Sequence, residues 1–179
     1  MRRVNSVLAM LIAALFFVHA ALGGFQLMGV LPKNTLMKVI SEIMMTLIAG
    51  HVLISIKLTA DTVIALKRSG AGYFRENKLF WIRRISGFAL MFFIISHLNI
   101  FGKDNGSPAR LQPFGAPELI SQILLALTLA LHIISNIKPL MLSLGLKSFK
   151  ELAIDAMLIA AVILLFAGAG FLVYFIRWA

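Results

Sequence analysis

The dominant pattern in the chain is a series of long apolar segments separated by short polar ones. Four of these segments contain no Asp, Glu, Lys or Arg. They cover residues 4–32, 85–102, 119–137 and 156–176. A fifth segment, at about residues 39–66, is also apolar but contains Glu42, Lys57 and Asp61. Because a helix needs roughly 20 apolar residues to cross a bilayer and satisfies its own backbone there, the pattern predicts an all-α fold. We expect an integral membrane bundle of five transmembrane helices, in a single domain of residues 1–179.

The composition supports a membrane protein. The chain is 60% hydrophobic and only 13% charged, with a mean hydropathy of +0.95, which is unlike a soluble domain of this size. It has no cysteine, so disulfides, iron–sulfur clusters and c-type haem attachment are excluded in this chain. The first apolar run continues past Ala20 to Val30, longer than the apolar part of a signal peptide, so we expect it to be retained as the first helix.

Basic residues are distributed unevenly between the two sides of the predicted bundle. With the N-terminus placed in the cytoplasm, eleven Lys and Arg residues flank the spans on the inside and five on the outside, with Lys57 counted as intramembrane. This asymmetry predicts a cytoplasmic N-terminus and a C-terminus outside. It also accounts for most of the formal net charge of +10, and because the basic residues flank spans, no nucleic-acid partner is expected. The basic loop at residues 67–84 follows from topology alone or is a docking surface for a soluble cytoplasmic partner.

Histidine occurs four times, once on each of the first four apolar segments. The four are His19, His51, His97 and His132. At 1.5 Å per residue, the first and third lie roughly 22 Å from the inner starts of their helices, in the outer half. The second and fourth lie roughly 21–22 Å from the outer starts of theirs, in the inner half. Because an imidazole in hydrocarbon is costly and generally functional, depth predicts an outer pair, His19 with His97, and an inner pair, His51 with His132.

Each pair is suited to hold a haem iron between two imidazoles. Six-coordinate iron has no open position for oxygen and suits electron transfer, so two b haems stacked across the bilayer would carry electrons from one face to the other. Intramembrane histidines also cap helix kinks, bond to neighbours or relay protons in transporters. A metal transporter usually adds carboxylate or sulfur ligands, which are scarce in these spans.

The order of the histidines resembles that of a known family. One histidine on each of the first four of five helices is similar to the di-haem cytochrome b membrane-anchor subunit of the succinate dehydrogenase/fumarate reductase family, in its five-helix, single-anchor class. The residues Arg84, Ser86 and Gly87, followed by His97, resemble the Arg-x-Ser/Thr-Gly entry of haem-bearing helices in that superfamily. The chain departs from some relatives at Ala130, where they have a glutamate in a transmembrane proton path.

The resemblance implies a subunit of a larger enzyme. Flavoprotein and iron–sulfur subunits would bind its cytoplasmic face, and membrane quinone, typically menaquinone in this class, would be its redox substrate. The chain would lie in a prokaryotic cytoplasmic membrane and would have no dicarboxylate site of its own. The resemblance leaves open whether the whole complex forms a higher oligomer.

Five other residues are candidates for binding roles. Glu42, near the outer end of the second helix, is a candidate for quinone protonation or an ordinary interfacial carboxylate. Asn99 and Lys103 could bind a haem propionate or a quinone carbonyl, or be ordinary helix-end residues. Arg84 and Ser86, at the inner entry of the third helix, could hold inner-haem propionates or form a quinone site, although the positive-inside rule alone explains Arg84.

Two other functions remain open. One is the cytochrome b subunit of another quinone-linked dehydrogenase or of a hydrogenase, enzymes that often place two haem ligands on one helix. The other is a haem-free transporter, which predicts broken helices and intramembrane carboxylates. One histidine per helix and a basic cytoplasmic face favour the succinate dehydrogenase/fumarate reductase family.

Overall fold

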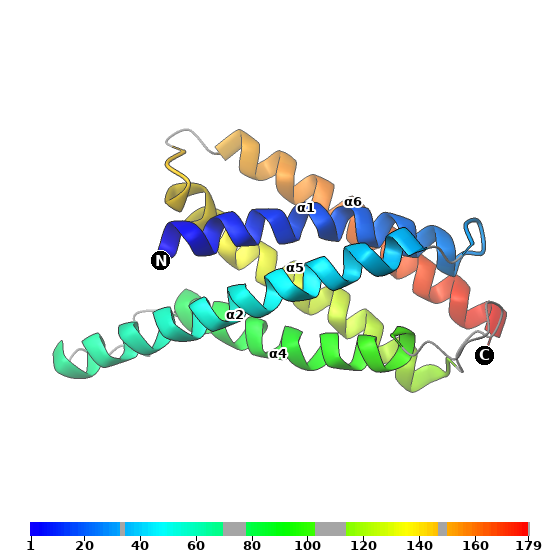
Figure 1. Ribbon diagram of the computed structural model, residues 1–179, viewed down its shortest axis with the longest axis horizontal. Helices are drawn as coiled ribbons and strands as arrows, with labels where there is room; N and C mark the ends of the chain where they lie inside the picture. The colour runs from blue at the N-terminus through cyan, green and yellow to red at the C-terminus, as the bar shows by residue number, and fades with distance from the viewer. Residues whose placement is uncertain (33–34, 70–77, 103–113, 147–149, 179) are drawn as a thin grey trace.

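The described residues of the chain form five α-helices (Figure 1). The computed structural model describes residues 1–32, 35–69, 78–102, 114–146 and 150–178. The helices are α1 (Arg2–Leu27), α2 (Thr35–Ser69), α4 (Lys78–Phe101), α5 (Ala116–Ser143) and α6 (Lys150–Trp178). All five are long and apolar enough to cross a membrane. This confirms the predicted all-helical fold with five apolar spans and agrees with a multi-pass membrane protein.

Each helix runs antiparallel to the one before it, so the two termini lie at opposite ends of the bundle (Figure 1). We call the end at which α1 begins the amino end and the end at which α6 finishes the carboxyl end. Charged residues continue the helices beyond the apolar runs, and four of the five helices are longer than their runs, whereas α1 ends at Leu27, before its run does. For example, α1 begins at Arg2 and α4 begins at Lys78.

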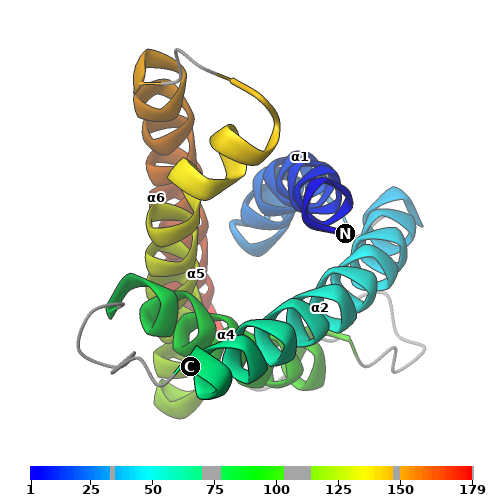
Figure 2. The same cartoon turned by 90° about the vertical axis from the view of Figure 1, so that its left-hand side faces the viewer.

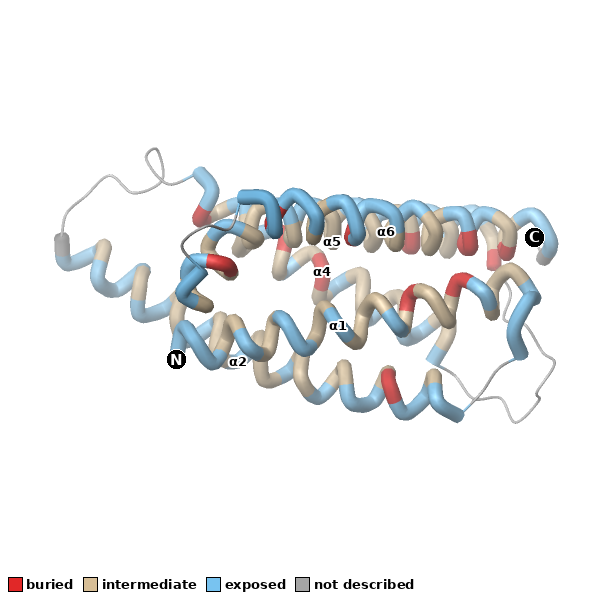
Figure 3. The backbone as a smooth tube through the Cα atoms, turned by 90° about the horizontal axis from the view of Figure 1, so that it is seen from above, coloured by how far each residue is buried: buried red, intermediate tan, exposed pale blue. Residues whose placement is uncertain are grey.

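The helices surround a central space instead of a solid core. Helix α1 packs against α2 and α6, and α5 packs against α4 and α6, with a weaker contact between α1 and α5. Seen along the bundle, α5 and α6 lie opposite α1 and α2 (Figure 2). Few stretches are fully buried (Figure 3), and the large apolar side chains of Phe92, Leu165 and Ile176 are 70%, 75% and 78% exposed. Lipid tails are as apolar as leucine, so such a surface suits a bilayer.

Two features hold the carboxyl end together. Helices α1 and α6 cross at Gly24 and Gly170, where a Cβ atom on Gly170 would lie 3.3 Å from the Cα atom of Gly24. Small residues at such a crossing let two backbones approach closely. Beside the crossing, Phe114, Phe171 and Tyr174 form a buried cluster. The carboxyl end is therefore closed by direct side-chain packing.

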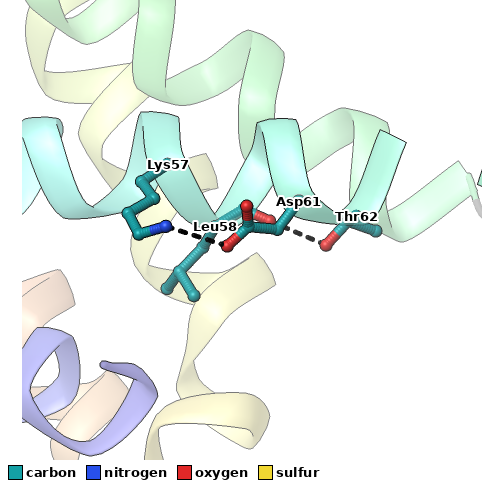
Figure 4. A network of polar contacts seen from close by, with 4 residues as sticks. All are labelled: Lys57, Leu58, Asp61 and Thr62. Atoms are coloured by element: carbon teal, nitrogen blue, oxygen red, sulfur yellow. Dashed lines mark hydrogen bonds and ion pairs between the residues drawn. The ribbon is translucent and has the colours of Figure 1, made fainter. Parts of the chain in front are cut away.

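Helix α2 extends beyond the other helices at the amino end (Figure 1). Its 35 residues span about 52 Å, whereas the hydrocarbon core of a bilayer is about 30 Å thick. In the half of α2 toward this end, Lys57 and Asp61 form an ion pair of 3.5 Å, with side chains 55% and 58% exposed (Figure 4). One residue along, the Thr62 hydroxyl donates to the Leu58 carbonyl at 2.7 Å. The charges of Lys57 and Asp61 are thus paired along the surface of α2, and neither residue lines the central space.

Candidate functional site

A large cavity lies between the helices. Its volume is about 2570 Å³, and all five helices line it. All four histidines, His19, His51, His97 and His132, are among its lining residues. Ordinary ligand pockets measure roughly 300–1,000 Å³, so this cavity has room for more than one large ligand. Most of its remaining lining is Ala, Leu, Ile, Met and Phe, which suits a flat, largely apolar ligand.

Two of the histidines face each other toward the carboxyl end. The ring centres of His19 on α1 and His97 on α4 are 6.1 Å apart, and the rings are inclined at 65°. Two imidazoles on opposite sides of one metal ion would have ring centres about 6 Å apart, since each metal–nitrogen bond measures roughly 2.0–2.1 Å and each nitrogen lies about 1 Å from its ring centre. With this spacing, the two rings could hold one metal ion between them.

A buried glutamine holds the imidazole of His97. The Oε1 atom of Gln122, a residue of α5 that is 0% exposed, lies 2.7 Å from the Nδ1 atom of His97. The amide nitrogen of Gln122 donates to the hydroxyl of Ser121 at 2.9 Å. Because this places the carbonyl oxygen of the amide toward the ring, His97 donates from Nδ1, and its Nε2 carries the lone pair.

The same assignment follows for His19. The hydroxyl of Ser41 on α2 donates to the Met37 carbonyl at 2.8 Å, and its oxygen lies 3.2 Å from Nδ1 of His19. Since the hydroxyl proton is used within α2, the oxygen accepts from the Nδ1 proton of His19. The lone pair of His19 is therefore also on Nε2.

The other two histidines lie toward the amino end. His51 on α2 and His132 on α5 are close enough to interact electrostatically, and Arg84 on α4 interacts with both. The Ser86 hydroxyl donates to the Arg83 carbonyl at 3.2 Å and lies 3.0 Å from Nδ1 of His132. By the same reasoning, His132 donates from Nδ1 and keeps its lone pair on Nε2.

Gly87 explains how α4 approaches the ring of His132. A Cβ atom on Gly87 would lie 3.4 Å from Cε1 of His132 and 3.8 Å from its Nδ1, so the ring rests against the bare backbone. The adjacent Ser86 and Gly87 therefore act together on the histidine of the neighbouring helix. His51 differs from the other three, because its buried Nδ1 has no hydrogen-bond partner among the described residues and its ring interacts with the backbone of Asn5 on α1.

Three of the imidazoles are held in a tautomer that leaves Nε2 available to bind a metal. Histidines that bind metals almost always donate their other ring N–H to an acceptor, which fixes the tautomer and the ring orientation. His19, His97 and His132 each have such an acceptor, from the side chains of Ser41, Gln122 and Ser86. The described residues contain no group of three or more His, Cys, Asp or Glu side chains able to hold a bare metal ion. A haem iron needs only two protein ligands, so a pair of these histidines could hold one.

The other predicted site residues fall in different places. Arg84 and Glu42 line the cavity, toward the amino and carboxyl ends respectively. Ser86 is 2% exposed and bonds to the Arg83 carbonyl and to His132. Asn99 lines a separate, smaller cleft between α4 and α5. Lys103 lies outside the described residues.

Sequence reasoning missed two of the histidine partners, Ser41 and Gln122. Each has a weak signal in the sequence. Gln122 is an uncharged polar residue with a long side chain inside an otherwise apolar run, and a buried amide in a membrane span needs a partner. Ser41 lies about a helical span after His19 in the chain, and only the packing of α1 against α2 reveals that the two meet.

Known proteins offer no further guidance. No protein-family model, no curated protein and no solved structure matches this chain. Functional inference therefore rests on the cavity and its histidines.

Proposed function

We propose that the chain is a di-haem cytochrome b, the membrane anchor and electron-transfer subunit of a succinate:quinone oxidoreductase, that is, a succinate dehydrogenase or fumarate reductase. The observation that carries the proposal is the placement of all four histidines around one large apolar cavity. One pair has the ring spacing of axial ligands, and three rings have their Nε2 lone pairs available. The order of the histidines along the chain adds support through the resemblance described above.

In this proposal His19 and His97 hold one haem, and His51 and His132 hold the other. Each bound haem supplies reversible one-electron transfer at its iron. The cationic side chains of Arg84 and of its neighbours along the amino-end rim are suited to haem propionates. These neighbours are Arg2, Arg3 and Arg83. The apolar remainder of the lining excludes water from the porphyrin faces.

The proposed orientation follows from charge. Basic residues predominate at the amino end, which supports a cytoplasmic position for this end under the positive-inside rule, and the family resemblance favours a prokaryotic membrane. Flavoprotein and iron–sulfur subunits then bind there, next to the His51/His132 pair. Membrane quinone, of the menaquinone type, exchanges electrons near the His19/His97 pair. The chain has no dicarboxylate site and acts as one part of the enzyme.

Two other functions are alternatives to this proposal. The cytochrome b subunit of another quinone-linked dehydrogenase or hydrogenase would use the same cavity with different soluble partners. A haem-free transporter needs carboxylates along its path, whereas Glu42 is the only carboxylate lining the cavity within the described parts of the chain. The haem-free alternative also gives no role to the three imidazoles whose Nε2 lone pairs are available.

The test is the haem content of the purified chain. A dithionite-reduced minus oxidised spectrum, with extracted haem counted per polypeptide, should give two b haems. Flavoprotein and iron–sulfur subunits should co-purify from the native membrane with succinate-dependent haem reduction. One haem per chain would contradict the two-pair assignment, and a colourless protein would exclude the redox function. Two haems with a hydrogenase or another dehydrogenase bound would favour the first alternative.

A further inference from the structure

Helix α5 contains a proline in its last turns. Pro139 lies inside the helix, which ends at Ser143. Because proline has no backbone N–H, the carbonyl four residues earlier, that of Ser135, loses its partner in the helix. A backbone carbonyl without a partner is costly inside a bilayer, where no water reaches it. The fold therefore needs a donor for the Ser135 carbonyl from outside the backbone of α5.

Arg83 on α4 supplies this donor. Its Nε atom donates to the carbonyl of Ser135 at 2.8 Å, and both residues are half-buried. The oxygen that Arg83 binds is thus the one that Pro139 leaves free. Neighbouring helices commonly satisfy the backbone groups that a proline frees in a membrane span, and here a charged side chain does so.

Two further contacts join the same stretch of α4 to α5. The hydroxyl of Ser86 lies 3.0 Å from Nδ1 of His132, and a Cβ atom on Gly87 would lie 3.4 Å from Cε1 of the same ring. Ser86 and Gly87 follow Arg83 by three and four residues, so all three lie on one face of α4. Helix α4 therefore contacts α5 at the histidine and again one turn beyond it, at Ser135.

Beyond the proline, the end of α5 turns toward α1. In Figure 2 this end, drawn in yellow, leaves the line of the rest of the helix. The hydroxyl of Ser143 forms a hydrogen bond with that of Ser6 on α1, and residues 139–144 all line the central cavity. The end of α5 is thus a wall of the cavity at the amino end, and the bond from Arg83 lies where the turn begins.

We propose that Arg83 is a positioning residue, which holds the bend of α5 at Pro139 and thereby the orientation of the His132 imidazole in the central cavity. The inference rests on the proposed function, because it takes His132 to be a ligand of the amino-end haem, the one shared with His51. The role differs from that of Arg84, which interacts with both of these histidines through its charge. Beyond the charge that it adds to the amino-end rim, Arg83 acts through geometry, by satisfying a backbone carbonyl.

A double-mutant cycle separates this role from an effect of charge. Arg83→Met removes the donor and keeps much of the apolar length of the side chain, whereas Pro139→Ala returns a backbone N–H to the carbonyl of Ser135. The measurement is amide hydrogen exchange of peptides from residues 133–146 in the purified chain. Arg83→Met should make this exchange about tenfold faster, which corresponds to about 1.4 kcal/mol, close to the contribution of a hydrogen bond from a charged donor. In the Pro139→Ala background, the same change should make it less than about twofold faster.

The second readout is the EPR spectrum of the oxidised protein. The signal of a ferric haem with two histidine ligands depends on the angle between the two imidazole planes. Arg83→Met should therefore shift the signal of the amino-end haem and leave that of the carboxyl-end haem, held by His19 and His97, unchanged. Adding Pro139→Ala should reverse most of the shift.

Arg84→Met is the matched control, because it removes the same charge from the next residue along α4. Its effect on the potential of the amino-end haem should be the same with or without Pro139→Ala. If the effects of Arg83→Met were also independent of Pro139→Ala, Arg83 would act through its charge and the proposal would be wrong.

Three other results have a defined meaning. Unchanged exchange of residues 133–146 in Arg83→Met would overturn the proposal. Faster exchange with an unchanged signal of the amino-end haem would also overturn it, because the bend would then be held without orienting His132. A preparation without haem would contradict the proposed function, and the exchange measurements would still decide whether Arg83 compensates for Pro139.

Discussion

The two histidine pairs have the same chemistry but very different surroundings. At the carboxyl end, His97 lies against Phe101 and Phe171, with ring centres 5.0 and 6.5 Å away, and it donates to the fully buried Gln122. At the amino end, Arg84 interacts with both histidines of the pair, and the Nδ1 atom of His51 has no partner among the described residues. His97 is thus held among neutral groups, whereas the amino-end pair lies beside a cation.

For the two haems proposed above, this difference predicts unequal potentials. A nearby cation stabilises the reduced haem, which carries one positive charge fewer, and therefore raises its potential. A hydrogen bond from Nδ1–H to an acceptor increases the basicity of the imidazole, stabilises the ferric state and lowers the potential. The haem beside Arg84 should therefore be reduced first. Electrons entering at the amino end then have a favourable first acceptor.

Replacing one of the proposed histidine ligands should change the two haems the most. His97→Ala should abolish the carboxyl-end haem and leave the amino-end haem, and His51→Ala should do the reverse. Each variant should bind one haem per chain, because the pairs lie in separate halves of the cavity. Haem content and redox titration would check this. If either single change left both haems bound, the assignment of ligands would be wrong.

The next effect concerns Arg84. Replacing it with glutamine should lower the potential of the amino-end haem by on the order of 50–100 mV, since a unit charge about 8 Å away contributes about 2 kcal/mol at an effective dielectric constant of about 20. Potentiometric titration would resolve the two haems. Lys57→Gln is a suitable control, because Lys57 forms an exposed ion pair and does not line the cavity. If the haem potential shifted equally in both variants, the overall charge of the chain, and not Arg84 in particular, would set the difference between the two haem potentials.

A smaller effect should follow from Gln122. The change Gln122→Leu removes the acceptor for the Nδ1 proton of His97 and should raise the potential of the carboxyl-end haem by about 20–60 mV, from a hydrogen bond worth about 0.5–1.5 kcal/mol. The two potentials should therefore converge. Ser86→Ala, which removes the acceptor of His132, should move the other haem instead. A Gln122→Leu variant that loses haem without shifting the potential would indicate a purely structural role.

The smallest effect is expected at Gly87. A methyl group there would lie 3.4 Å from Cε1 of His132, so Gly87→Ala should displace that ring by a few tenths of an ångström and keep both haems. The cost to stability should be below about 1 kcal/mol, at the low end of overpacking effects. Only the spectrum of the amino-end haem should change. Gly168→Ala is the control, because nothing lies within 4 Å of its added Cβ atom among the described residues.

Much of the fold could be predicted from the sequence, because length and hydropathy alone decide which segments can span a bilayer. The five apolar runs became five helices, although four of the helices are longer than their runs, most clearly α5 and α6. The level of each histidine along its helix follows from the fixed rise per residue. The two rings that this arithmetic assigned to one level, those of His19 and His97, lie 6.1 Å apart.

Tertiary structure alone decided which side chains support the histidines and which face the lipid. Ser41, Gln122 and the pairing of Gly87 with His132 depend on how each helix is rotated about its axis and which helix is its neighbour. In a soluble protein an amphipathic pattern would reveal that rotation. Here the interior and the lipid are equally apolar, so hydropathy along a span gives its position and length but not its rotation. That rotation turns four separate histidines into two pairs.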